Sequence, residues 1–304
     1  MDGRISNLSQ IMSICRYTIT EGAGVGLDVI DCNNGTLRFL VNLSRSADIM
    51  QLYHKGENVS FVSKNGFTSK TGDFLSRFEG GMLYTCGLDS VGGREGYELH
   101  GTHHLTVATL LRAEANEKGI VIETMMRESA LFGRNLLFRR KITTSLFEET
   151  LHIEDTLVNE DVEDANYCLL YHVNLGYPML DEGAEMIADI ASCEPRTEWA
   201  KENVKSKLTI SSPSPRMEEC CYFLHLNTPS VTLKNQKNKK AFTLTYSADT
   251  LPEFVEWKSM ASGDYALGLE PSTTKLDDGF AYCVLPSGES VRFVLNLRVS
   301  QLQV

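Results

Sequence analysis

The segment Glu149-Thr150-Leu151-His152-Ile153-Glu154-Asp155-Thr156-Leu157-Val158 alternates apolar and polar side chains. Leu151 and Ile153 alternate with His152 and Glu154, and this period of two is typical of a β-strand with one buried face. A helix would instead repeat its apolar residues every three or four positions. The segment therefore predicts a strand that covers a hydrophobic core.

Similar runs continue along most of the chain, and turns rich in Gly, Asn, Asp, Pro or Ser separate them. The charged segment Arg112–Gly119 is predicted to be such a turn, and only Glu194–Val204 has a helical pattern. So many strands at short spacing favour a large antiparallel β-supersandwich with few short helices over a parallel α/β sheet. Further strands are expected at Leu105–Leu111, Ile120–Met125, Leu136–Ile142, Tyr167–Leu175, Lys207–Ile210, Cys220–Leu226, Val231–Lys234, Ala241–Tyr246, Phe254–Lys258, Tyr265–Glu270, Phe280–Leu285 and Val291–Leu297.

Length and charge limit the classes of protein. The 304 residues can bury a large core, and because no change of composition marks a linker, one domain is predicted over residues 1–304. The 29 basic and 40 acidic residues give a net charge of −11, which repels phosphate backbones, so nucleic acid is not expected as a partner. The basic cluster Lys234–Lys240 lies between two predicted strands and is expected at a hairpin tip.

The sequence also indicates a compartment. No run approaches the ~18 consecutive apolar residues of a membrane span, and polar residues interrupt Ile5–Ile14, so no signal peptide is expected. The eight cysteines form no CxxC pair, which is typical of reduced, buried thiols. These features predict a cytoplasmic protein without membrane contact. The expected assembly is a monomer or a homodimer.

A first candidate group lies near the end of a predicted strand. Because alternate residues of a strand share a face, a strand over Tyr167–Leu175 places His172 and Asn174 side by side. The residues that follow this strand, Gly176-Tyr177-Pro178, indicate a loop at the rim of a site. The alternative is that His172 is a hydrogen-bonded core histidine.

A second candidate group precedes Pro271. The strand expected there puts Ala266, Gly268 and Glu270 on one face, where two small residues leave space for a ligand beside the carboxylate. The flat ring of Trp257 suits the apolar side of a sugar. The alternatives are a surface glutamate on an edge strand and a core tryptophan.

Three histidines suggest a metal site, because imidazoles three or four positions apart can share an ion. No acidic residue or cysteine lies at a ligand spacing near His100, His103 and His104, so no metal site is predicted. The glycine-rich segment Glu21–Gly26 precedes a strand-like run rather than a helix, which argues against a dinucleotide loop.

Taken together, these residues resemble the aldose 1-epimerase (galactose mutarotase-like) family. The resemblance runs from about residue 35 to the C-terminus and includes the signatures YHxNxGYP and GLEP of a less characterised bacterial branch. It implies one β-supersandwich domain, no cofactor, and a free sugar with a hemiacetal carbon as substrate. The matching positions are Arg45, Asp48, His100-Gly101, Tyr171–Pro178, Trp257 and Gly268–Pro271.

The resemblance also implies residue roles. In the family a glutamate takes the proton of the anomeric hydroxyl while a histidine protonates the ring oxygen, so the ring opens, rotates and recloses as the other anomer. Glu270 is then the base and His172 the acid, with His100 as the other candidate acid. Classical mutarotases place this histidine four residues before the Asn-Leu pair; here it lies two before it, which keeps the strand face. The sugar-binding residues implied are Arg45, Asp48, His100, Asn174 and Trp257.

The function predicted is thus a cytoplasmic, cofactor-independent isomerase, a carbohydrate mutarotase. One alternative is a non-catalytic sugar-binding or sensing protein, which needs no acid–base pair. A second is a metal-dependent sugar isomerase that uses His100, His103 or His104. A glycosidase needs two carboxylates across one bond and ranks last, because only Glu270 stands out.

Overall fold

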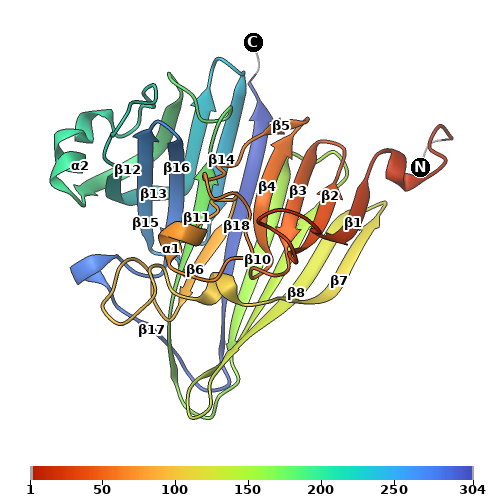
Figure 1. Ribbon diagram of the computed structural model, residues 1–304, viewed down its shortest axis with the longest axis horizontal. Helices are drawn as coiled ribbons and strands as arrows, with labels where there is room; N and C mark the ends of the chain where they lie inside the picture. The colour runs from red at the N-terminus through yellow and green to blue at the C-terminus, as the bar shows by residue number, and fades with distance from the viewer. Residues whose placement is uncertain (1–2, 303–304) are drawn as a thin grey trace.

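The structure, a computed structural model, describes residues 3–302. The two ends of the domain predicted over residues 1–304 therefore lie outside the described residues. The structure is 52% strand and 7% helix, and its strands form two antiparallel sheets (Figure 1). This confirms the all-β class and the large antiparallel sandwich.

The N-terminal quarter forms a five-stranded sheet in sequence order, β1-β2-β3-β4-β5. Each strand pairs with its sequence neighbour, so short turns suffice as connections. The strands are β1 (Ser13–Thr18), β2 (Asp28–Asn33), β3 (Leu37–Asn42), β4 (Asp48–His54) and β5 (Glu57–Asn58).

The remaining strands form one large sheet of 13 strands, in the order β17-β11-β16-β15-β13-β14-β18-β10-β9-β8-β7, with β12 paired to β13 and β6 paired to β11. These strands are β6 (Tyr84–Leu88), β7 (Thr109–Asn116), β8 (Gly119–Ser129), β9 (Asn135–Thr144), β10 (Thr150–Asn159), β11 (Ala165–Leu175), β12 (Glu185–Pro195), β13 (Cys220–Asn235), β14 (Lys240–Tyr246), β15 (Glu253–Ala261), β16 (Asp264–Ser272), β17 (Cys283–Leu285) and β18 (Ser290–Gln301).

Helices are short connectors: α1 (Phe74–Arg77), α2 (Glu198–Glu202), and the 3-10 turns η1 (Leu8–Gln10), η2 (His103–Leu105), η3 (Val204–Ser206) and η4 (Asp277–Gly279). The helix predicted over Glu194–Val204 is therefore shortened. Strand β12 continues to Pro195, and α2 begins after Thr197, whose hydroxyl caps it by accepting the Ala200 N–H at 3.1 Å.

Several other predictions need correction. The strands predicted over Leu105–Leu111 and Phe280–Leu285 begin only at Thr109 and Cys283. Most of the turn predicted over Arg112–Gly119 is strand, because β7 continues to Asn116 and pairs with β8. Arg112 and Glu114 form an ion pair with each other on the exposed face of β7. Lys207–Ile210 is no strand; only Thr209 makes an isolated bridge there. The two runs predicted within 220–234 are one long strand, β13. The lysine cluster does lie at a hairpin tip, between β13 and β14.

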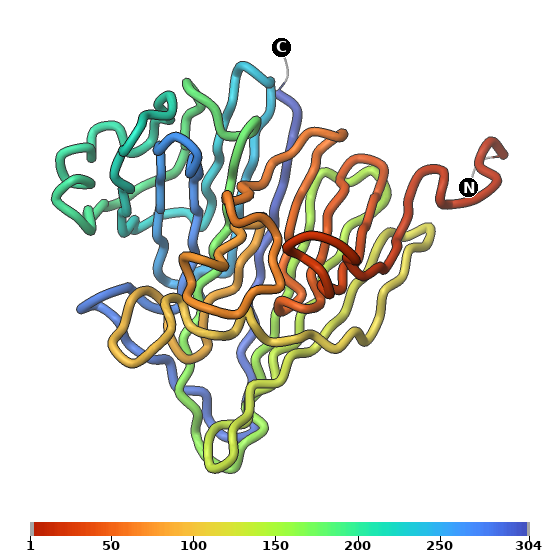
Figure 2. Tube along the Cα trace, viewed as in Figure 1, coloured from red at the N-terminus to blue at the C-terminus, as the bar shows by residue number. Residues whose placement is uncertain are grey.

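The main hydrophobic core lies between the two sheets. Phe39 of the small sheet belongs to the same buried cluster as Phe138 and Ile153 of the large sheet. A second, smaller cluster lies on the other face of β11, around Tyr84 and Leu170. Figure 2 shows the orange to amber trace, residues about 60–105, crossing this second face. Strand β11 therefore has one face in the core and one under this long connection.

A buried ionic network joins the two sheets through the core. Arg140 of β9 is 1% exposed and contacts Asp48 of β4 at 2.5 Å and Asp155 of β10 at 2.7 Å. The Tyr171 hydroxyl of β11 donates to Asp155 at 2.7 Å. Each buried charge thus has an opposite charge and hydrogen-bond partners, as the desolvation cost of burial requires.

Across residues 3–302, the structure contains no helix with the length and apolar character needed to cross a membrane.

Candidate active site

Strand register brings the two predicted catalytic residues together. Val173 pairs with Leu269 and Asn174 with Gly268, so His172 of β11 lies across from Glu270 of β16 on the same face. His172 Nε2 is 3.1 Å from Glu270 Oε1, and the side chains are only 6% and 2% exposed. A buried imidazole beside a buried carboxyl is an arrangement that can move protons.

Gly268 makes room for this pair. A Cβ at Gly268 would overlap Glu270 Oε1 and would lie 3.0 Å from His172 Cε1 and 3.2 Å from Trp257 Cε3. The sequence suggested that the small residues before Glu270 leave space for a ligand. In the structure the two catalytic candidates themselves fill the space over Gly268.

The pair opens into a cavity of about 550 Å³, a size typical of small-molecule sites. Three aromatic rings surround the histidines. Phe74 of α1 lies 5.2 Å from the His100 ring, and Phe78 lies 5.5 Å from the His172 ring, centroid to centroid. Trp257 of β15 meets the His172 ring edge to face at 5.4 Å. The walls next to the pair are therefore mostly apolar.

His100 reaches the cavity from a loop. Its ring centroid is 5.7 Å from that of His172. The Gly92 N–H donates to His100 Nδ1 at 3.3 Å, which leaves Nε2 to carry the proton of the neutral ring. His100 and Gly101 both have positive φ, and a Cβ at Gly101 would overlap Asp89 and the backbone of Gly87. The glycine thus allows the backbone packing that holds His100 in place.

Burial sets the protonation states of the site. Desolvation raises the pKa of Glu270 well above its usual value, and the nearby Glu219 carboxylate raises it further. Desolvation and the neighbouring His100 lower the pKa of His172 well below its usual value. Desolvation also lowers the pKa of His100, to about 4. These shifts favour the protonated form of Glu270 and the neutral forms of both imidazoles.

Unpaired polar atoms support that assignment. Glu270 Oε1 and His172 Nδ1 are buried and have no hydrogen-bond partner among the described residues, and the 3.1 Å contact between the side chains lacks hydrogen-bond alignment. A buried carboxylate or imidazolium without such partners is costly, whereas the neutral groups cost less.

Charged residues at the rim were missed from the sequence. Glu219, just before β13, accepts the Trp257 indole N–H at 2.7 Å. Arg196 forms a two-bond ion pair with Asp277 at 2.6 and 2.7 Å. Lys64 pairs with Asp264 at 2.8 Å. These residues carry no local motif, and only the register that places Cys221 opposite Trp257 brings the start of β13 to the cavity.

Three of the predicted sugar-binding residues do not line the cavity. Arg45 is buried and donates to the carbonyl oxygens of Thr68 and Lys70. Asp48 is committed to Arg140 and to the sheet-spanning network. Asn174 is fully buried and donates to the His172 carbonyl at 2.9 Å. His100 and Trp257 do line the cavity.

The three histidines considered for a metal are directed to different partners. His103 Nδ1 is 2.5 Å from Glu128, His104 Nδ1 is 2.7 Å from Asp48, and His100 faces the cavity. Within residues 3–302, no three His, Cys, Asp or Glu side chains are grouped so that they could hold a metal ion.

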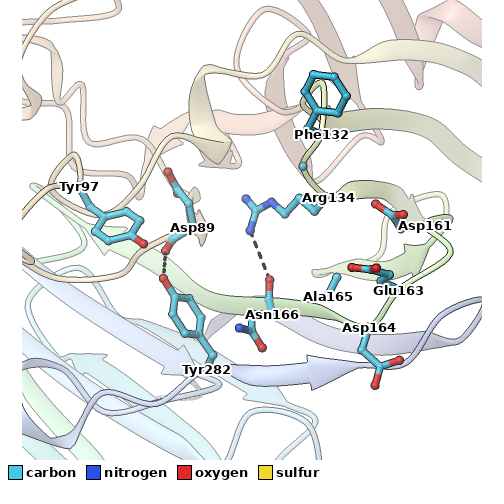
Figure 3. A pocket seen from close by; sticks show the side chains of 11 residues that line it. Asp89, Tyr97, Phe132, Arg134, Asp161, Glu163, Asp164, Ala165, Asn166 and Tyr282 are labelled. Atoms are coloured by element: carbon cyan, nitrogen blue, oxygen red, sulfur yellow. Dashed lines mark hydrogen bonds between the residues drawn. The ribbon is translucent and has the colours of Figure 1, made fainter.

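A second cavity, of about 700 Å³, is shown in Figure 3. It is lined by several carboxylates, but its Arg134 is committed to the carbonyl oxygens of Leu88 and Asn166 and to Glu128. No histidine lies among its lining residues. The histidine–glutamate pair therefore makes the smaller cavity the better candidate.

Comparison with known proteins places this chain in a family. Residues 24–282 match the profile of a family described as a domain of unknown function, DUF4432. The chain belongs to this family. No curated protein sequence matches it significantly.

Solved structures share the fold of this family member. A candidate aldose 1-epimerase from Klebsiella pneumoniae is 20% identical, with 95% of this chain and 83% of that chain covered and a TM-score of 0.83. A galactose mutarotase-like protein from Clostridium acetobutylicum is 14% identical, with 96% and 100% covered and a TM-score of 0.72. At these identities the likeness shows the fold, and the resemblance to galactose mutarotase-like proteins is confirmed at that level.

Proposed function

We propose that this protein is a carbohydrate mutarotase, which interconverts the anomers of a free sugar. The observation that carries the proposal is the buried pair of His172 Nε2 and Glu270 Oε1, 3.1 Å apart, at the wall of a cavity of about 550 Å³. The galactose mutarotase-like fold supports it, because solved structures of that fold include candidate aldose 1-epimerases.

The proposed proton positions reverse those expected from the sequence. With Glu270 protonated and His172 neutral, the carboxyl is the acid and the imidazole is the base. His172 Nε2 takes the proton of the anomeric hydroxyl, whose electrons form the C1=O double bond as the bond from C1 to the ring oxygen breaks. Glu270 gives its proton to that ring oxygen. After rotation about C1–C2, the same transfers run backward and close the ring on the other face.

A protein that only binds sugars is the second candidate, and the same cavity could serve it. Binding needs hydrogen bonds to hydroxyl groups but no acid and base of separated pKa. The opposite pKa shifts of Glu270 and His172 favour the catalytic function. Because His100, His103 and His104 have separate partners, no contact favours the metal-dependent isomerase.

The test is Glu270→Gln, which keeps the size of the side chain but removes its proton transfer. We expect anomer exchange, followed by NMR or polarimetry, to fall by about 10²- to 10⁴-fold while sugar binding persists. Glu256→Gln is the matched control, because Glu256 is a buried glutamate on the adjacent strand that points to the opposite face. Exchange at the wild-type rate in Glu270→Gln would refute the catalytic assignment.

A further inference from the structure

The polar groups that line the cavity are unevenly distributed. The acid–base pair and His100 are embedded among the rings of Phe74, Phe78 and Trp257, within 5.2 to 5.5 Å centroid to centroid. A sugar that reacts at this pair would place the carbons that flank its reacting bond next to these rings. A hydroxyl group buried there without a hydrogen-bond partner destabilises the complex.

Two other polar side chains of the wall, Asn65 and Ser63, already donate hydrogen bonds to backbone carbonyls. Asn65 Nδ2 donates to the carbonyl oxygens of Leu75 and Phe78 at 3.0 and 2.9 Å. Ser63 Oγ donates to the same Phe78 carbonyl at 2.6 Å. These contacts fix the aromatic wall and leave it with few free hydrogen-bonding groups for a fully hydroxylated sugar.

The cavity also has no spare positive charge. Of the described lining residues, the cations are Lys64 and Arg196, and each is paired with a carboxylate. Glu219, held by Trp257, adds a negative charge that no cation balances within ion-pair distance. A phosphate or carboxylate on the substrate would thus meet repulsion rather than a binding partner.

Resting on the proposed mutarotase function, we infer that the substrate is an uncharged 6-deoxy sugar, whose methyl group packs against the wall of Phe74 and Phe78. Two positions flank the reacting centre: C2, and C5 with its exocyclic carbon. Removal of a hydroxyl group yields a methyl group only at the exocyclic carbon. That methyl group is stabilised by burial against the rings, and the desolvation cost of the missing hydroxyl group is avoided.

The experiment compares matched sugars with the wild-type protein: D-fucose with D-galactose, L-fucose with L-galactose, L-rhamnose with L-mannose, and 6-deoxy-D-glucose with D-glucose. We expect the best substrate to be a 6-deoxy sugar that exceeds its parent in kcat/KM by about 10- to 100-fold. Parent sugars that match or exceed their 6-deoxy partners would overturn the inference and leave the mutarotase function standing. A preference for galactose 6-phosphate or galacturonate would overturn it too.

If none of these sugars exchanges faster than in buffer, the proposed function itself fails. The variant Phe78→Tyr adds a hydroxyl group to the wall, so we expect the preference for the 6-deoxy partner to shrink at least several-fold. Phe132→Tyr is the control, because Phe132 is fully exposed and lines the other cavity. An unchanged preference in Phe78→Tyr, with the fold intact by circular dichroism, would contradict the role of the wall.

Discussion

At the scale of single residues, the site depends on what surrounds Glu270 and His172 more than on their identity. Elsewhere in the fold, buried carboxylates are stabilised by a cation, since Asp48 and Asp155 both contact Arg140. Among the described residues, Glu270 forms no ion pair with a lysine or arginine, and its charged-group contact is with His172, whose ring meets Trp257. Burial therefore favours the neutral carboxyl group at Glu270, whereas contact with Arg140 favours the charged carboxylate.

The pH dependence of the rate follows from these directions. Because the pKa of His172 is lowered, the rate should fall at acid pH, where the imidazole gains a proton and stops accepting one. Because the pKa of Glu270 is raised, the rate should fall at alkaline pH, where the carboxyl has lost the proton that it must donate. We expect a bell-shaped profile of kcat/KM with the acid limb due to the histidine.

Because Glu270 and His172 are in contact, the two limbs of the pH–rate profile report apparent pKa values of the pair rather than of either residue. NMR of ¹⁵N-labelled histidine would show which limb belongs to His172. The resting His172 should give the signals of a neutral imidazole near pH 7 and become charged only along the acid limb. Signals of a charged imidazolium at pH 7 would restore the roles expected from the sequence.

At the scale of elements, the sequence predicted which strands carry the site but not what covers them. Alternation along β11 and β16 correctly placed His172 and Glu270 on cavity-facing positions, because the period of a strand is local information. The pairing of these strands, nearly 100 residues apart, could be anticipated only through the resemblance. The segment of residues about 60–105, which covers these strands and includes α1, has no periodic pattern, so the sequence did not predict its aromatic wall. The charged residues at the rim carry no motif and were missed as well.

Strand parity and single motifs each had exceptions, since Asn174 shares the strand face of His172 yet does not line the cavity. Arg45 and Asp48 matched the family in order along the chain, yet they serve buried structural contacts here. Arg112–Gly119 was taken for a turn because its charges resemble loop composition. In the structure, these charges are the solvent face of an edge strand.

The covering segment gives a prediction at this scale. Asn65→Ala removes two hydrogen bonds that hold α1 and Phe78, each worth about 1 kcal/mol. We expect the KM for the sugar to rise by up to about tenfold, with a smaller change in kcat, because the wall loosens while the acid–base pair keeps its strands. Asn227→Ala, which removes one exposed hydrogen bond on β13, should change neither constant. A loss of kcat alone would show that the segment acts on chemistry instead.

At the scale of the whole molecule, a buried glutamate outside the cavity limits stability. Glu256 is fully buried, both of its carboxylate oxygens lack a hydrogen-bond partner among the described residues, and Lys258 is 3.7 Å away. Desolvation raises the pKa of Glu256 to about 7. Since the unfolded chain holds this proton less tightly, stability is lost as pH rises toward 7.

Glu256→Gln should remove that loss. We expect the free energy of unfolding in urea at pH 8 to rise by roughly 1–3 kcal/mol, and the gain at pH 6 to be smaller by about 1 kcal/mol. Glu163→Gln, at an exposed position, should show no such difference between the two pH values. Destabilisation of Glu256→Gln at pH 8 would mean that the contact with Lys258 outweighs the burial of the charge.

The ionic network between the sheets also bears on how the chain avoids a misregistered fold. Slipping a strand by one residue turns its apolar side chains to the wrong face, but slipping it by two restores the alternation. Hydrophobic patterning alone thus tolerates a two-residue slip of β11, which would carry His172 away from Glu270. Such a slip would also break the hydrogen bond from the Tyr171 hydroxyl to Asp155. A slip of β9 or β10 would separate Arg140 from Asp155 and leave an unpaired charge in the core. We infer that these buried charges select the one alignment in which the cavity is assembled.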